Sequence, residues 1–199
     1  MESPSSWTIG LSGEYILNFP IYVGCVYGLF IGSGEGHQRL WPAPKALVMD
    51  DIDKLALKQQ WDQWWNQVVM LLANRFRNKS DRPNLGMGLA EYHFSDIDGE
   101  LLRQCCMDSW PAFVHWWNSP AGGQVAMYYW EGFPKVERYV EEYEELVGRK
   151  VKPFALSVNL IYTGIPAPME PVPDYIIMPI DGSFLLNKDW WLDRFKQRY

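Results

Sequence analysis

The sequence predicts an α+β fold: a mostly antiparallel sheet with about four helices packed on it, in a single domain over residues 1–199 whose first residues, 1–6, are flexible. Apolar residues recur at helical spacing in several segments and alternate with polar residues over 154–162. Strands and helices mix without the regular rhythm of a parallel α/β protein. Hydrophobic residues make up 48% of the chain and charged residues 21%, which is the composition of a globular protein.

The first strands are expected in the uncharged run from Tyr15 to Ile31. Pro20, Gly24 and Gly28 interrupt this run, and β-branched and aromatic residues lie between the interruptions. Two buried strands joined near Pro20 explain these features better than a membrane span, which needs a longer uninterrupted apolar helix.

Two helices are predicted next. The first begins near Asp51, because apolar residues follow at spacings of three and four from Leu57 onward, and basic residues near its end suit the helix dipole. The second begins after Ser95 in a segment that resembles a capping box, and Pro111 is expected to break or restart it.

The following segments are predicted as a strand, a helix and a strand. Residues 124–130 are apolar on both faces, as in the middle of a sheet. Residues 134–148 begin with proline, carry an apolar stripe and end with glycine, which is typical of a helix. The clearest strand is 154–162, and its polar face is expected to meet solvent or a ligand.

The end of the chain is predicted as a connector, a hairpin and a helix. Residues 164–174 hold four prolines and are expected to form an ordered connector. Asp181 and Gly182 lie between two apolar runs, which indicates a two-residue hairpin turn. A short helix over 188–199 closes the chain.

Charge and cysteine content narrow the classes of partner and compartment. A net charge of −6 disfavours nucleic acid and anionic membrane surfaces as partners. The three cysteines, an odd number with one adjacent pair, do not form the framework of a disulfide-rich secreted domain, so we expect a reducing, cytoplasmic compartment.

Cofactor and metal motifs are weak. The glycine-rich loop at 32–36 is followed by prolines rather than by the helix that a phosphate-binding loop requires. The acidic clusters at 50–53 and 96–100 each begin a predicted helix, where capping already accounts for carboxylates. The vicinal Cys105 and Cys106 are explained better as buried apolar residues than as nucleophiles. We therefore predict no cofactor and no metal.

Glu91 and His93 are the candidate catalytic pair. They lie two residues apart on a predicted strand over 89–94, so both side chains share one face. A carboxylate beside an imidazole can orient a proton-transfer base or hold a metal, and it can equally form a surface ion pair.

Two sets of residues are candidates for binding a protein. The first is acidic and lies opposite the apolar stripe of the predicted helix over 134–148, where it would attract a basic partner; it comprises Glu137, Glu141, Glu144 and Glu145. The second comes from the eleven tryptophans, six of which form doublets. Trp64 and Trp65 fit a core stripe, whereas Trp116 and Trp190 lie off the apolar side of their helices and are interface candidates.

These observations predict a non-enzymatic intracellular protein-binding domain, with the general build of inhibitor and immunity-type proteins. Two alternatives stay open. One is a small-ligand binder or enzyme with an aromatic-lined pocket that uses Glu91 and His93. The other is a structural component of a larger assembly, and the sequence does not decide the oligomeric state.

Overall fold

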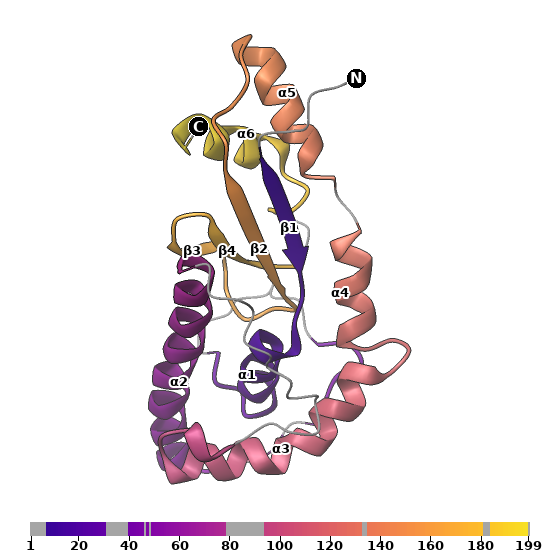
Figure 1. Ribbon diagram of the computed structural model, residues 1–199. Coiled ribbons are helices and arrows are strands. Elements are labelled where there is room, and N and C mark those ends of the chain that lie inside the picture. The colour runs from indigo at the N-terminus through magenta and orange to yellow at the C-terminus, as the bar shows by residue number, and fades with distance from the viewer. Residues whose placement is uncertain are drawn as a thin grey trace.

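The computed structural model describes residues 7–30, 40–45, 47, 49–78, 94–132, 135–180 and 184–198. Within these residues the chain forms six α-helices, one short 3-10 helix and one four-stranded sheet (Figure 1). The strands are β1 (Thr8–Ser12), β2 (Ala155–Ile161), β3 (Met169–Val172) and β4 (Tyr175–Pro179). The helices are α1 (Tyr15–Val26), α2 (Asp51–Arg77), α3 (Glu100–Asn118), α4 (Gly123–Glu131), α5 (Glu137–Val147) and α6 (Lys188–Arg198), with η2 (Phe94–Asp96) before α3. The mixture of helices and a sheet is confirmed, and the described helices outnumber the four predicted.

The sheet is mixed, so the prediction of a mostly antiparallel sheet is wrong. Its order is β1-β2-β4-β3, with parallel pairing of β1 to β2 and of β2 to β4, and antiparallel pairing only between β3 and β4. A parallel pair needs a long crossover. The chain between Ser12 and Ala155, which carries α1 to α5, supplies that crossover for β1 and β2.

Strand predictions succeed in part. The strand predicted over 154–162 is confirmed as β2, and the apolar run that follows the connector forms β4. The predicted connector over 164–174 contains a strand, β3, and β1 lies in a segment for which no strand was predicted. The prediction of a second hairpin strand is wrong, because residues 184–186 form a turn. The predicted turn residues Asp181 and Gly182 lie outside the described residues.

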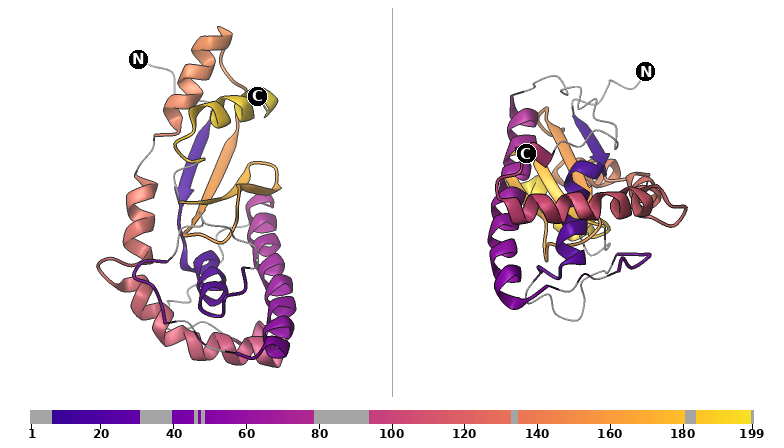
Figure 2. Two further views of the ribbon diagram at one scale, coloured as in Figure 1. Left: turned by 180° about the vertical axis from the view of Figure 1, so that it is seen from behind. Right: turned by 90° about the horizontal axis from the view of Figure 1, so that it is seen from below.

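Helix α1 replaces the two strands predicted between Tyr15 and Ile31. It is enclosed by other elements, and Figures 1 and 2 show it below the sheet, with α2 alongside and α3 crossing beneath it. Phe19 contacts Trp64 of α2 at a ring distance of 5.9 Å and Phe113 of α3 at 5.0 Å. A helix that is apolar on all sides is stable only when it is buried, as α1 is.

A buried polar residue joins α1 to the sheet. Asn18 is 1% exposed, and its Nδ2 donates to the carbonyl oxygens of Glu14 at 2.9 Å and of Leu160 at 3.1 Å. Its Oδ1 accepts a hydrogen bond from the backbone N–H of Tyr162 at 2.8 Å. The amide therefore satisfies backbone groups where β2 ends.

The remaining helices follow the sequence pattern with three exceptions. Helix α2 begins after Asp50, whose side chain accepts from the N–H of Asp53 at 2.9 Å, as expected for an N-cap. The capping box predicted at Ser95 is wrong, because Ser95 lies in η2 and α3 begins at Glu100 after Gly99, which supplies no side-chain cap. Helix α3 continues through Pro111 instead of breaking there. Residues 124–130, predicted as a strand, belong to helix α4.

The two faces of the sheet are covered by different helices. Phe154 contacts Phe195 of α6, while Tyr175, whose partner in the β2 register is Ser157, contacts Phe76 of α2. Because side chains alternate along a strand, these contacts lie on opposite faces. Within the described part of the chain, none of the helices has the combined length and apolarity needed to cross a bilayer.

Candidate functional site

The tryptophan doublets are mainly core residues. Trp64, Trp65 and Trp117 are buried, as predicted, but so is the interface candidate Trp116, at 5% exposure. The indole Nε1 of Trp116 donates to the backbone carbonyl of Trp41 at 3.1 Å. Its ring is therefore not available to a partner, contrary to the reasoning that placed it off the apolar side of α3.

Trp190, the other interface candidate, is half-buried on α6. Its ring meets Trp191 edge-on at 4.7 Å and Phe184 at 6.2 Å. Much of its apolar surface is thus used in packing α6, and only the remainder can reach a partner.

The four predicted carboxylates of α5 do not form one surface. Glu141 and Glu145 are exposed and Glu137 is half-buried, but Glu144 is buried. Its Oε1 accepts from the N–H of Val151 at 3.0 Å and its Oε2 from Lys150 Nζ at 2.7 Å. Expecting Glu144 on the outer face of the helix was wrong, because the chain folds back after α5 and uses this carboxylate to satisfy its own backbone.

The pKa of Glu144 reflects this role. Burial acts to raise the pKa of the carboxyl group, but the hydrogen bonds from Lys150 and Val151 and the positive charge of Lys150 outweigh it, so the pKa lies below its ordinary value. The neighbouring Glu142 pairs with Lys188 of α6. Two lysines therefore offset part of the acidic character of α5.

The predicted catalytic pair Glu91 and His93 lies outside the described residues, as do the glycine-rich loop at 32–36 and residues 1–6. Among the residues that the structure does describe, no group of three or more histidine, cysteine or acidic side chains is placed to hold a metal ion.

The thiols are unsuited to nucleophilic chemistry. Cys105 and Cys106 are buried residues of α3, and Cys25 is half-buried near the end of α1. Burial raises the pKa of the Cys25 thiol to about 12 and also raises the pKa of Cys105 and of Cys106. Since the thiolate is the reactive form, the structure favours the apolar interpretation of these residues.

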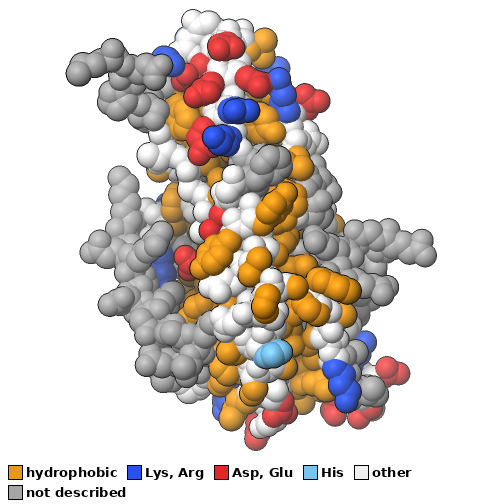
Figure 3. Space-filling view, turned by 90° about the vertical axis from the view of Figure 1, so that its right-hand side faces the viewer, with side chains coloured by type: hydrophobic (Ala, Val, Ile, Leu, Met, Phe, Trp, Pro, Cys, Tyr) orange, Lys and Arg blue, Asp and Glu red, His pale blue; other side chains and the backbone are white. Residues whose placement is uncertain are grey.

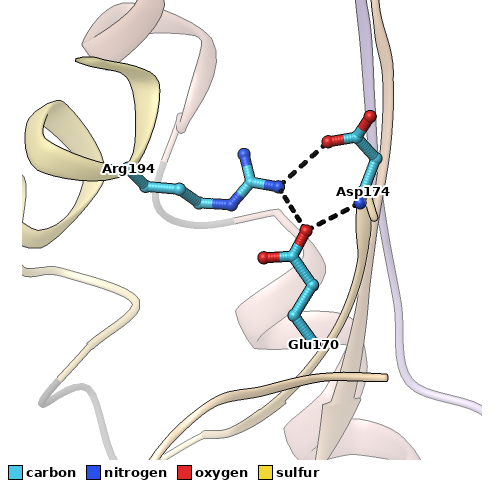
Figure 4. A network of polar contacts seen from close by, with 3 residues as sticks. All are labelled: Glu170, Asp174 and Arg194. Carbon is cyan, nitrogen blue, oxygen red and sulfur yellow. Dashed lines mark hydrogen bonds and ion pairs between the residues drawn. The ribbon is translucent and has the colours of Figure 1, made fainter. Parts of the chain in front are cut away.

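One charged network links α6 to the turn between β3 and β4 (Figure 4). Arg194 Nη2 lies 3.1 Å from Glu170 Oε1 and 3.1 Å from Asp174 Oδ1, and Glu170 Oε1 also accepts from the N–H of Asp174 at 2.7 Å. Asp174 has a positive φ of 66°. The network thus holds an unusual backbone conformation and the terminal helix together, which is a structural role.

Among the described residues, two adjacent exposed tyrosines lie on α4, a segment that the sequence interpretation had placed inside a sheet. One side of α4 is buried through Gly123 and Met127. The other side carries Val125, Tyr128 and Tyr129 at spacings of three and four residues, exposed by 48%, 61% and 65%. Figure 3, which views the molecule from the side that α4 occupies, shows hydrophobic side chains gathered there.

The Trp41 segment contacts the end of α3, next to the start of α4. Its carbonyl oxygen accepts a hydrogen bond from Trp116, and its side chain is 67% exposed. A methyl group added at Gly123, the first residue of α4, would lie 2.5 Å from the Trp116 ring. We call Val125, Tyr128 and Tyr129 the α4 face.

The α4 face lies in an almost uncharged part of the chain. Between Arg103 and Lys135 the sequence has no lysine or arginine, and its only acidic residues are Asp108 and Glu131. Glu131 Oε1 accepts a hydrogen bond from the N–H of Gly13 at 2.7 Å. A surface helix normally presents charged or polar residues to water, so an exposed, neutral, tyrosine-rich side is unusual.

Sequence reasoning missed this surface because residues 124–130 were interpreted as a buried strand. The signal that could have found it was the long stretch without lysine or arginine, combined with adjacent tyrosines. Such a composition is typical of buried segments and of interface cores, which are depleted of charge and enriched in Tyr and Trp.

No family model, no curated protein and no solved structure matches the chain. A function therefore has to be argued from the geometry.

Proposed function

We propose that this protein is a non-enzymatic protein-binding domain and that the α4 face is its contact surface. The observation that carries the proposal is the exposed, neutral, aromatic side of α4. Contiguous apolar surface of this kind, free of charge, is characteristic of protein interfaces. Tyr128 and Tyr129 belong to a residue type that contributes strongly to binding free energy at such sites.

The two tyrosine rings are held by local contacts, which favours binding. Gln124 Nε2 donates to the Tyr128 hydroxyl at 3.0 Å, and the Tyr129 ring meets Trp130 edge-on at 5.6 Å. A side chain that is already ordered loses less conformational entropy when a partner covers it. The α4 face is thus better prepared for contact than a set of freely rotating side chains.

The α4 face favours a partner with an apolar, uncharged contact area. The basic partner predicted from the acidic helix would instead meet Glu141 and Glu145 of α5, where Lys150 and Lys188 reduce the negative potential. Inhibitor and immunity-type proteins act by binding a target protein. The neutral, aromatic α4 face is suited to such binding. The alternative enzyme or ligand-binding function, through Glu91 and His93, stays a prediction.

Affinity capture from native lysate tests the proposal. The bait is the wild-type chain, compared with the double variant Tyr128→Ser/Tyr129→Ser and with Leu146→Ser as a matched control. Leu146 is 75% exposed on α5, away from α4, so its variant removes exposed apolar surface without changing the α4 face. We expect one protein to bind the wild type and the control in stoichiometric amount, but not the double variant. That protein can be a different protein or a differently tagged copy of this chain. Equal capture by all three baits would refute the proposal.

A further inference from the structure

Strands β1 and β2 leave one side of their parallel pair open. Six small residues pair across the two strands on this side: Thr8 with Ala155, Gly10 with Ser157, and Ser12 with Asn159. Thr8, Gly10 and Ala155 are exposed, and the other three are half-buried. Helix α2 covers the neighbouring β4 through the contact of Phe76 with Tyr175. We call the six residues the β1–β2 face. Parallel strands are normally covered on both sides, so this open, polar face is unusual.

The β1–β2 face carries hydrogen-bonding groups that the fold does not use. Asn159 Nδ2 donates to Ser157 Oγ at 3.1 Å and to the carbonyl oxygen of Ile176 at 3.2 Å. The hydroxyl proton of Ser157 and the amide oxygen of Asn159 then have no partner among the described residues, and the same holds for the hydroxyl groups of Thr8 and Ser12. A ligand can therefore bind these groups without breaking a hydrogen bond of the fold.

A buried hydroxyl group adjoins the same face. Tyr175 lies beside Ser157 in the register, so its side chain is on the same side of the sheet. Tyr175 is only 4% exposed, yet its hydroxyl group forms no hydrogen bond with a described residue. Burial raises the pKa of this hydroxyl group, and the negative charge of Glu14, which follows β1, raises it further. The influence of Glu14 indicates that the hydroxyl group is directed across β2 toward β1.

The unpaired hydroxyl group of Tyr175 points to a ligand. The hydroxyl group of a buried tyrosine normally has a hydrogen-bond partner, because an unsatisfied polar group is costly inside a protein. A ligand on the β1–β2 face would supply the missing partner. This observation is independent of the small, polar residues of the two strands, because Tyr175 belongs to β4.

Gly10 keeps the centre of the face clear. A methyl group added at Gly10 would have no atom within 4 Å, and its neighbour across the pair, Ser157, is also small. From Thr8 to Ser12 the face is about 13 Å long, at about 3.3 Å per residue of strand. A flat ring of several hydroxyl groups can therefore lie over the strands and reach the side chains on each side of Gly10.

The chemistry of the face distinguishes among the classes of ligand. It carries no basic residue, and Glu14 nearby is negative, so an anion gains no attraction. Among the described residues no group of side chains is placed to hold a metal ion. Protein interfaces are depleted of serine and enriched in aromatic residues, which is the opposite of this composition.

We propose that the β1–β2 face binds a neutral saccharide. The hydroxyl groups of a sugar ring both donate and accept hydrogen bonds, and they match the free groups of Ser157, Asn159 and Tyr175. This site is separate from the α4 face and does not rest on the proposed function.

NMR titration of the purified full chain tests the proposal. The probes are the methyl glycosides of glucose, galactose, mannose and N-acetylglucosamine and the disaccharides maltose, cellobiose and lactose. Each is added up to about 20 mM, well above the millimolar dissociation constant of a weak site. We expect at least one probe to shift the backbone amide signals of β1 and β2 and to reach saturation. If none of them does, the inference is overturned. A stronger response to sialic acid, an anionic sugar, would also overturn it.

Two variants locate the bound saccharide. Tyr175→Phe removes only a hydroxyl group that has no partner in the fold, so the thermal unfolding midpoint should not fall. The dissociation constant of the saccharide should rise about tenfold, as expected for the loss of one hydrogen bond. Gly10→Leu fills the clear centre of the face and should abolish binding. Ala112→Leu, at an exposed position of α3, is the matched control and should bind like the wild type. Binding that neither Tyr175→Phe nor Gly10→Leu weakens would refute the inference, because the saccharide would lie elsewhere.

Discussion

Replacing Asn18 with leucine should strongly destabilise the protein. Leucine is close to asparagine in size, so Asn18→Leu removes the amide without opening a large cavity. The substitution leaves two buried backbone groups without their partner, the carbonyl of Leu160 and the N–H of Tyr162. Each unsatisfied buried group costs about 1–3 kcal/mol, so the expected loss for the two groups is about 2–6 kcal/mol in the free energy of unfolding.

Urea unfolding followed by tryptophan fluorescence measures this loss, because many of the tryptophans surround α1. Asn159→Leu is the matched control. Asn159 Nδ2 also bonds to a backbone carbonyl, that of Ile176, at 3.2 Å, but the side chain is only half-buried. Water can replace the amide there, and the expected loss is below about 1 kcal/mol. If Asn18→Leu costs no more than Asn159→Leu, the amide does not anchor α1 to the sheet.

Three further predictions concern the core and its ionisable groups. Glu144→Gln should flatten the acid side of the plot of stability against pH. Because the pKa of Glu144 is lowered in the folded state, the ionised carboxylate stabilises the fold at neutral pH, and this stabilisation is lost as pH falls through the carboxyl range. The unfolding free energies of wild type and variant should therefore converge in acid. The three native thiols, protonated and largely buried, should react with a thiol reagent at pH 7.5 only after denaturant is added, and rapid labelling of the folded chain would contradict their raised pKa. Gly123→Ala should cost about 1–3 kcal/mol by thermal unfolding, because the new methyl group would lie 2.5 Å from the Trp116 ring, while Gly10→Ala, which has open space around it, should be close to neutral.

Elements with one apolar side were predicted well. Helix α5 shows an apolar stripe and a terminal glycine, and Gly148 does adopt the left-handed conformation, with φ of 66°. Strand β2 alternates buried Leu156, Val158 and Leu160 with less buried residues, as its sequence indicates. One-sided burial produces a period in the sequence, and the period identifies the element.

Elements that are apolar on all sides were not predicted. Helix α1 carries β-branched and aromatic residues with Pro20 in its middle, and these local preferences indicate strands. Complete burial removes the period that would have revealed a helix, so tertiary packing decided against local preference. Strands β1 and β3 were missed for the opposite reason: they are short, and residues such as Gly10 and Pro171 resemble loops.

The same limit applied to the candidate site. Exposure of a residue depends on which neighbour covers it. Sequence spacing could not show that the chain after α5 covers Glu144, or that Tyr22 of α1 and Tyr162 after β2 pack against the Trp116 ring. Both residues were placed on the correct helices but on the wrong side. Tyr128 was overlooked because its helix had been interpreted as a strand.

The orientation of α4 explains why its aromatic side has to face outward. The packed side of the helix is tightly fitted at two places. At Gly123 the Trp116 ring leaves no space for even a methyl group, and at Gly13 an added methyl group would lie 2.4 Å from the sulfur of Met127. Rotating α4 to bury Tyr128 and Tyr129 would push side chains into both contacts, at a cost typical of overpacking, about 1–3 kcal/mol or more. The helix is therefore fixed by what lies behind it, and its aromatic side stays at the surface.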